Sequence, residues 1–203
     1  MVEDRPAKPH AAVSLLIDAS GSMGYGPNSR AFYATEAGIV LAEVMDRLGF
    51  AFEVVDFNSM YGGEYQCGYT AMNVRKPFEG QMNAVTKAAI ATDHTGRENS
   101  DGHAVEWCIK RVQRQDATHR FVFTISDGQP AGPCPDDCST PSEHLTRVVQ
   151  NCPDNVEIFS VGIAGMDTSR YYENAVKINN TAELAENLLP VLRKMLGQVR
   201  VAA

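Results

Sequence analysis

The chain has 203 residues, of which 44% are hydrophobic and 21% are charged, and its formal net charge is -7. This composition is typical of a globular domain with a large core, and no apolar run approaches the roughly 20 residues that a membrane helix needs. The negative charge argues against nucleic-acid binding, which normally needs a basic surface, and it fits a protein that attracts cations or a basic partner.

The N-terminal segment is charged, contains two prolines and lacks the apolar stretch of a signal peptide. We therefore expect a flexible arm over residues 1–11 and a single domain over residues 12–203. The five cysteines are odd in number and irregularly spaced, which does not indicate a disulfide framework. Without an export signal, reduced thiols in a cytoplasmic protein are expected.

Strands and helices are predicted to alternate along the chain, from apolar or alternating runs and from 3.6-residue periodicity. In chain order, the predicted elements are a strand at 13–17, a helix at 30–48, a strand at 50–57, a short edge strand at 65–74, helices at 83–92 and 103–115, a strand at 120–126, a helix at 142–150, a strand at 156–161, a short helix near 171–172, an edge strand at 175–178 and a final helix at 181–196. This alternation predicts a Rossmann-like α/β fold, with an open, mostly parallel sheet and helices on both faces.

A carboxylate and two hydroxyl groups follow directly after the first predicted strand, in the stretch Asp18-Ala-Ser20-Gly-Ser22. In open α/β sheets, ligands bind beyond the carboxyl ends of the strands, which is where this stretch should lie. Carboxylate and hydroxyl oxygens are hard ligands that suit Mg²⁺, Mn²⁺ or Ca²⁺. The alternative is a polar turn in which Ser22 caps the next helix. This stretch by itself leaves both interpretations open.

Two further loops are expected at the same edge of the sheet. The strand predicted at 120–126 ends in Ser126-Asp127-Gly128, and a polar loop at 97–102 leads into the next predicted helix. Taken by itself, Asp127-Gly128 favours a simple turn. Together, the three loops supply two carboxylates, two hydroxyls and either an amide or a third carboxylate. Such a set can neutralise a divalent cation without closing its coordination sphere, so we predict a Mg²⁺ or Mn²⁺ site.

These motifs resemble the von Willebrand factor type A (vWA) domain and its metal-ion-dependent adhesion site. More closely, the chain is similar to the C-terminal domain of the cobaltochelatase CobT subunit. The second similarity rests on Glu98–Gly102, Ile125–Pro130, Val161–Ile163, Arg170–Tyr172, Ala175–Ile178 and the helix that contains Glu183 and Leu184. The resemblance covers about residues 13–196 and implies the vWA fold.

The resemblance also implies a set of metal ligands. In the family, the two serines of the first loop bind the metal directly, and the aspartates often bind through water. The family commonly has a threonine in the middle loop, where this chain has none. Asn99 aligns best with it and Asp101 follows two residues later, so both are candidates. The expected ligands are Asp18, Ser20, Ser22, Asn99, Asp101 and Asp127.

The function implied by the resemblance is that of a metal-dependent protein-interaction module. The family's site typically keeps one position open for an Asp or Glu carboxylate of a partner, and the implied partner is a ring-forming AAA+ ATPase of the chelatase type. That pair would help a large catalytic subunit insert Co²⁺ into a corrin ring in cobalamin biosynthesis. We expect Co²⁺ insertion to take place elsewhere, because this chain lacks the soft or histidine-rich cluster that would handle Co²⁺ in transit. We also expect no chelatase, ATPase or esterase activity from the chain alone.

Two other classes of function are alternatives. A serine hydrolase would use Ser22, Asp127 and His144 in that order, but it leaves the Asp-x-Ser-x-Ser motif unexplained. A phosphohydrolase would use Asp18 as its nucleophile, but the second aspartate expected two residues later is absent. A zinc site would use Cys134-Pro-Asp-Asp-Cys138, but no second Cys or His pair accompanies it, so a proline-rich surface loop is the preferred interpretation.

Overall fold

The computed structural model describes residues 11–61, 68–92, 96–179 and 183–201 of the chain. The strands are β1 (Ala11–Asp18), β2 (Ala51–Tyr61), β3 (Gly68–Lys76), β4 (His119–Ser126), β5 (Glu157–Ile163) and β6 (Asn174–Ile178). The helices are the 3-10 helix η1 (Gly21–Met23) and the α-helices α1 (Arg30–Arg47), α2 (Ala84–Ala91), α3 (Asp101–Val112), α4 (Pro141–Gln150) and α5 (Leu184–Val201). Most of the expected arm lies outside the described residues, and Ala11 already belongs to β1.

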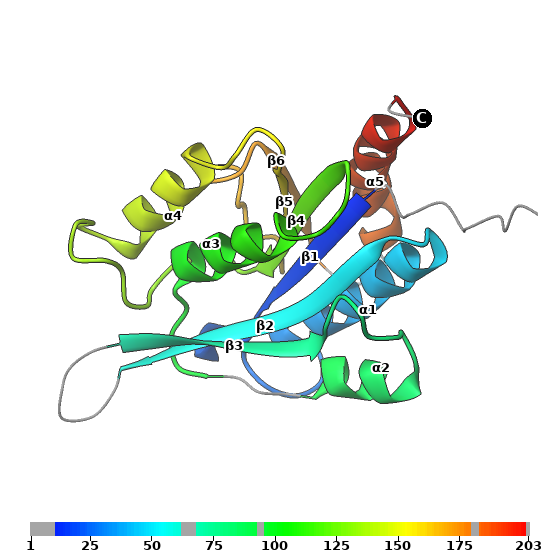
Figure 1. Cartoon of the computed structure of the whole chain (residues 1–203). Helices are drawn as coiled ribbons and strands as arrows, with labels where there is room; N and C mark the ends of the chain where they lie inside the picture. Colours follow the sequence, from blue (N-terminus) through cyan, green and yellow to red (C-terminus); the bar gives the residue numbers. More distant parts are fainter. Residues whose placement is uncertain (1–10, 62–67, 93–95, 180–182, 202–203) are drawn as a thin grey trace, which may run out of the picture.

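β1 lies inside a six-stranded sheet whose order is β3-β2-β1-β4-β5-β6 (Figure 1). It pairs in parallel with β2 on one side and with β4 on the other, and β5 and β6 continue the parallel arrangement. β3 runs antiparallel to β2 at the edge of the sheet. The predicted open, mostly parallel sheet is confirmed. The chain leaves β1 in one direction to form β2 and returns on its other side to form β4, so a topological switch point lies between β1 and β4.

Helices cover both faces of the sheet (Figure 1), α1, α2 and α5 on one face and α3 and α4 on the other. Side chains of a strand point alternately to the two faces. In β1, Val13, Leu15 and Ile17 join the cluster under α1, whereas Ala12 and Leu16 join the cluster under α3. Burial on both faces explains why the strand appears in the sequence as a continuous apolar run.

Local signals set several helix ends as predicted. Thr140 caps α4 by accepting a hydrogen bond from the Glu143 N–H (3.1 Å), and Pro141 occupies the first turn. Gly49 follows α1 with a φ of 70°, a left-handed conformation that glycine adopts without steric penalty. The predicted cap at Thr181 and part of the turn predicted at residues 61–63 lie outside the described residues.

Several predicted boundaries differ from the structure by a few residues, and three differences have a visible cause. β2 extends to Tyr61 because β3 pairs with it from Val54 to Tyr61. α3 begins at Asp101 rather than at residue 103, since Ser100 takes the N-cap position. The short helix expected near residues 171–172 is a turn, in which the backbone N–H groups of both tyrosines donate to the Thr168 carbonyl.

One charged group inside the fold is fully paired. Glu53 of β2 is buried, and its carboxylate accepts hydrogen bonds from Ser14 Oγ (2.8 Å) and Arg111 Nε (2.7 Å). Arg111 Nη2 also lies 2.6 Å from Glu53 Oε2. Buried charges need such partners, so Glu53 is a structural carboxylate.

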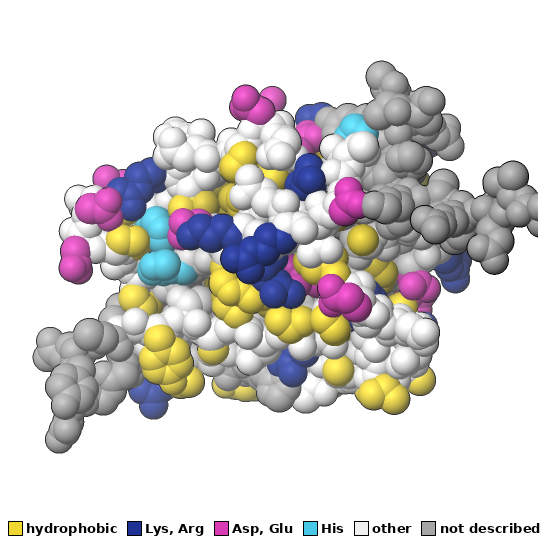
Figure 2. All heavy atoms as spheres, in the orientation of Figure 1, with side chains coloured by type: hydrophobic (Ala, Val, Ile, Leu, Met, Phe, Trp, Pro, Cys, Tyr) yellow, Lys and Arg dark blue, Asp and Glu magenta, His cyan; other side chains and the backbone are white. Residues whose placement is uncertain are grey.

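The face that carries α3 and α4 shows positive side chains beside negative ones (Figure 2). Lys110 pairs with Glu106 within α3, and Arg147 pairs with Asp137. Opposite charges on this face therefore compensate each other locally. None of the described helices has the length and apolar character that a membrane crossing would require.

Candidate metal centre

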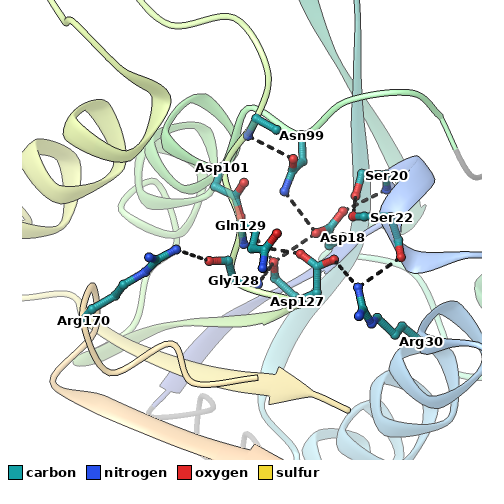
Figure 3. Close-up of polar contacts among 12 residues, drawn as sticks. Asp18, Ser20, Ser22, Arg30, Asn99, Asp101, Asp127, Gly128, Gln129 and Arg170 are labelled. Carbon is teal, nitrogen blue, oxygen red and sulfur yellow. Dashed lines mark hydrogen bonds and ion pairs between the residues drawn. The ribbon is translucent and has the colours of Figure 1, made fainter. Parts of the chain in front are cut away.

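Asp18 is the last residue of β1 and lies at the base of the candidate site, with 1% of its surface exposed. Its Oδ1 accepts a hydrogen bond from the Ser20 N–H (2.8 Å), and its Oδ2 accepts from Ser126 Oγ (3.0 Å) and Asn99 Nδ2 (3.4 Å) (Figure 3). The parallel pairing of β1 with β4 makes this possible, because Ile17 lies beside Ile125 and both strands end at the same level. Asp18 therefore joins three segments of the chain.

Ser20 and Ser22 present neighbouring hydroxyl groups, with their Oγ atoms 3.0 Å apart. Ser20 makes no side-chain capping bond to η1. Ser29 caps α1 by accepting a hydrogen bond from the Phe32 N–H (3.0 Å). The alternative in which Ser22 caps the next helix is therefore wrong. The two hydroxyls contact each other rather than the backbone, as ligands for a common ion would.

Asp127 follows β4, and its side chain is fully buried. Its Oδ1 accepts a hydrogen bond from the Gln129 N–H (3.3 Å), and Gly128 takes a φ of 71°. The turn predicted by Asp127-Gly128 is thus present in the backbone. Asp127 Oδ2 lies 3.1 Å from Nη1 of Arg30, so the second oxygen of this carboxylate serves a charged contact at the site.

Asn99 is buried in the middle loop, which comprises residues 96–100. Its Oδ1 accepts a hydrogen bond from the Ala131 N–H (3.1 Å), and its Nδ2 donates to Asp18 Oδ2. The reverse orientation of the amide would place its NH₂ group against the Ala131 N–H, so these two partners fix its direction. Asn99 turns its nitrogen toward Asp18 and holds the loop in place.

Asp101 is the first residue of α3 and is 4% exposed. Its Oδ1 lies 3.4 Å from Ser126 Oγ, while its Oδ2 is buried without a hydrogen-bond partner in the described part of the chain. Leaving such an oxygen unsatisfied is unfavourable, and a cation would satisfy it. Of the two candidates, Asp101 at the start of α3 offers an unpartnered oxygen and Asn99 in the middle loop does not.

Burial and neighbouring negative charge both disfavour the ionised forms of Asp18 and Asp101. The pKa of Asp18 is raised to about 6, mainly because burial disfavours its ionised form; the charge of Asp127 adds to the rise, while hydrogen bonds from Ser20 and Ser126 oppose it. The pKa of Asp101 is raised well above its ordinary value, by burial first and by the charge of Asp18 second. A positive ion among these groups would relieve their repulsion.

The available donors fit a hard divalent cation. Carboxylates of Asp18, Asp101 and Asp127 and hydroxyls of Ser20 and Ser22 provide oxygen ligands without nitrogen or sulfur. Within the described ranges, no three His, Cys, Asp or Glu side chains are arranged to hold an ion by themselves. We therefore consider the two serine hydroxyls together with the carboxylates as candidate ligands.

Two residues of the site are absent from the predicted set. Ser126 connects Asp18, Asp101 and, as an acceptor, the Gly128 N–H (3.0 Å). Its position directly before Asp127 at the end of a predicted strand was a usable signal. Arg30 gives no such signal, because nothing in the sequence relates it to Asp127, 97 residues away.

The hydrolase arrangements are not assembled. In the described structure, the hydrogen bonds of Ser22 and Asp127 involve no histidine. His144 is buried and lies edge-on against His103, with ring centroids 4.6 Å apart. Asp18 has hydrogen bonds on both carboxylate oxygens and is buried, which hinders attack on a substrate.

The cysteine pair lies in the loop between β4 and α4. Cys134 Sγ donates to the Cys138 carbonyl oxygen (3.7 Å), which is a contact within the loop. No cluster that would complete a zinc site accompanies the pair among the residues described. The surface-loop interpretation is thus the one that these contacts support.

Similar folds occur in several solved structures. A von Willebrand factor type A protein from Catenulispora acidiphila is 23% identical, with 88% of this chain and 41% of that chain covered and a TM-score of 0.60. The PilB minor pilin from Streptococcus sanguinis is 13% identical over 96% of this chain and 63% of that chain, with a TM-score of 0.69. Proximal thread matrix protein 1 from the mussel byssus is 17% identical over 91% and 47%, with a TM-score of 0.60. The chain spans less than two thirds of each of these proteins, and the likeness concerns the fold.

The sheet order and these neighbours show that the molecule has the von Willebrand factor type A fold. Residues 88–198, more than half of the chain, match the family described as the cobalamin biosynthesis protein CobT VWA domain. The chain belongs to this family. The match begins in α2 and includes Asn99, Asp101 and Asp127, whereas Asp18, Ser20 and Ser22 precede it.

Proposed function

We propose that this CobT-type vWA domain is a Mg²⁺-dependent interaction module of a cobaltochelatase-type complex. The observation that carries the proposal is the buried Oδ2 of Asp101, which has no hydrogen-bond partner among the described residues. Asp101 belongs to the same group of carboxylates as Asp18 and Asp127. A paired carboxylate such as Glu53 needs no ion. An unpaired one among like charges is stabilised in its ionised form by a cation and otherwise takes up a proton.

The proposed ligands are five in number and come from three segments of the chain. Ser20 and Ser22 hold the ion from the first loop, Asp101 from the start of α3, and Asp18 and Asp127 from the ends of β1 and β4. Asn99 and Ser126 orient these groups without binding. The bound ion supplies a positive charge that accepts an oxygen ligand from outside the chain.

The proposed partner is an AAA+ ATPase of the chelatase type that donates an Asp or Glu carboxylate to the site. A carboxylate adds charge neutralisation that a neutral ligand lacks, and its attraction to the ion is strong where water is excluded. Ser22 is exposed, so the mouth of the site faces solvent, where a partner can reach it. Insertion of Co²⁺ into the corrin ring is assigned to the large subunit of the complex.

The experiment that tests the proposal is a pull-down of the chelatase-type AAA+ ATPase from the same genome, in Mg²⁺ and in EDTA. The ATPase should bind wild type in Mg²⁺ and fail to bind in EDTA. Ser20→Ala/Ser22→Ala should fail in both conditions while it keeps a folded circular-dichroism spectrum. Ser139→Ala, which removes an exposed hydroxyl from the loop before α4, is the matched control and should bind normally. Equal binding of wild type in Mg²⁺ and in EDTA would refute the proposal.

A further inference from the structure

Arg30 places a positive charge directly against the candidate metal centre (Figure 3). Its Nη1 lies 3.1 Å from Asp127 Oδ2 and 3.4 Å from the Ser22 carbonyl oxygen. The Arg30 side chain therefore contacts the carboxylate of one proposed ligand, Asp127, and the backbone carbonyl of another, Ser22. Both contacts use the same nitrogen.

The position of Arg30 is not explained by the stability of its helix. It is the first residue of α1, where the helix dipole favours negative side chains and disfavours positive ones. The first turn of α1 contains no acidic residue that would pair with it locally. The contact with Asp127 is the interaction that compensates a cation at this place.

Arg30 is able to leave without disturbing the core. Its side chain is 40% exposed, whereas the Asp127 side chain is 0% exposed. The backbone of Arg30 is held independently, because Ser29 caps α1. Rotation about the side-chain bonds would move the guanidinium into solvent while the helix and the carboxylate stay in place.

A metal ion and the Arg30 guanidinium would compete for the same negatively charged group, the Asp127 carboxylate. Two positive charges separated by a few ångströms repel each other, and the repulsion is stronger beside buried groups than in water. If one cation weakens the binding of the other, the effect is reciprocal. The guanidinium neutralises Asp127 when the ion is absent and opposes the ion when it arrives.

We propose that Arg30 is an internal counter-cation of the metal centre: it holds Asp127 in the metal-free protein, lowers the affinity for Mg²⁺ and swings away when the ion binds. This inference rests on the proposed function, since it concerns the regulation of the same site. The weakened affinity makes occupancy depend on the Mg²⁺ concentration and on a partner carboxylate that stabilises the ion.

The test is a calorimetric titration of Mg²⁺ into wild type, Arg30→Gln and Arg170→Gln. Arg170 is the matched control, because its Nη2 donates to the Gly128 carbonyl (2.9 Å) beside the site and the guanidinium forms no ion pair among the described residues. Arg30→Gln should bind Mg²⁺ about tenfold more tightly than wild type, and Arg170→Gln should match wild type. A melting experiment in EDTA gives a second readout, in which Arg30→Gln should melt below wild type.

The outcomes separate the two proposals. Equal or weaker Mg²⁺ binding by Arg30→Gln would overturn the role of Arg30 and leave the metal centre standing. The same tightening in Arg170→Gln would also overturn it, because any loss of positive charge would then suffice. Absence of Mg²⁺ binding in all three proteins would overturn the metal centre and, with it, this inference.

Discussion

Asp18 and Asp101 approach the same hydroxyl group: Ser126 Oγ lies 3.0 Å from Asp18 Oδ2 and 3.4 Å from Asp101 Oδ1. A hydroxyl has a single proton, so it donates fully to one carboxylate at a time. The shorter contact favours Asp18. Asp101 is left with little hydrogen bonding from this serine and with an Oδ2 that has no partner among the described residues.

The first prediction follows from the raised pKa of Asp18 in the metal-free protein. Its folded pKa is about 6 against an ordinary value of 3.8. Between these values the folded state keeps a proton that the unfolded state has released, so the free energy of unfolding should fall as the pH rises from about 4 to about 6. The contribution is up to about 3 kcal/mol. Urea unfolding in EDTA measures it, and the fall should be smaller in Asp18→Asn. Parallel curves for the two proteins would contradict the prediction.

The second prediction concerns the middle loop. Asp101→Asn keeps the shape of the side chain and removes its charge, so Mg²⁺ affinity should fall at least about tenfold. Asn99→Ala removes the bonds to Ala131 and Asp18, so the free energy of unfolding should fall by about 1–2 kcal/mol, with a smaller loss of Mg²⁺ affinity. Calorimetry and urea unfolding separate the two effects. The opposite ranking of affinities would make Asn99 the ligand.

The third prediction concerns the identity of the ion. An ion that binds the folded state alone stabilises it by about 2.7 kcal/mol at a hundredfold excess over its dissociation constant. Mg²⁺ or Mn²⁺ should therefore raise the melting temperature of wild type, and Ser20→Ala/Ser22→Ala should lose the rise. An all-oxygen site should respond less to Zn²⁺ at the same free concentration. A melting temperature that Mg²⁺ leaves unchanged in wild type would count against the site.

The fourth prediction uses Glu53 as a control for buried charge. Glu53→Ala leaves Arg111 and Ser14 without their partner, and the partial exposure of Arg111 moderates the loss. The free energy of unfolding should fall by about 3 kcal/mol. Mg²⁺ affinity at 25 °C should stay within a factor of two of wild type, as measured by calorimetry on the folded variant. A large loss of Mg²⁺ affinity would contradict this prediction, because it would show that the contacts of Glu53 with Arg111 and Ser14 help to position the metal ligands.

Much of the fold could be predicted because its signals are local. The apolar runs of β1 and β4 are continuous since both faces are buried, and Thr140 and Gly49 set helix ends through bonds to near neighbours. The extension of β2 could not be predicted in the same way, because it depends on pairing with β3. The turn at residues 171–172 depends on the Thr168 carbonyl, a contact that apolar periodicity does not encode.

The sequence predicts which residues belong to the candidate site better than it predicts the role of each residue. Asp18, Ser20, Ser22 and Asp127 follow the two central strands, and the topology brings them together. The choice between Asn99 and Asp101 depends on the direction of one amide, which the Ala131 N–H sets from 32 residues away. Whether these residues bind an ion stays a prediction.

The place of β1 between β2 and β4 also has a consequence for the order of events during synthesis. Ser126 is synthesised 108 residues after Asp18, so the residues of β1, α1 and β2 leave the ribosome before β4 can pair with β1. The contacts of Asp18 and Asp101 with Ser126 depend on that late pairing. Ion binding would therefore require that β4 has paired with β1. A ribosome-bound chain that stops before β4 should bind no Mg²⁺.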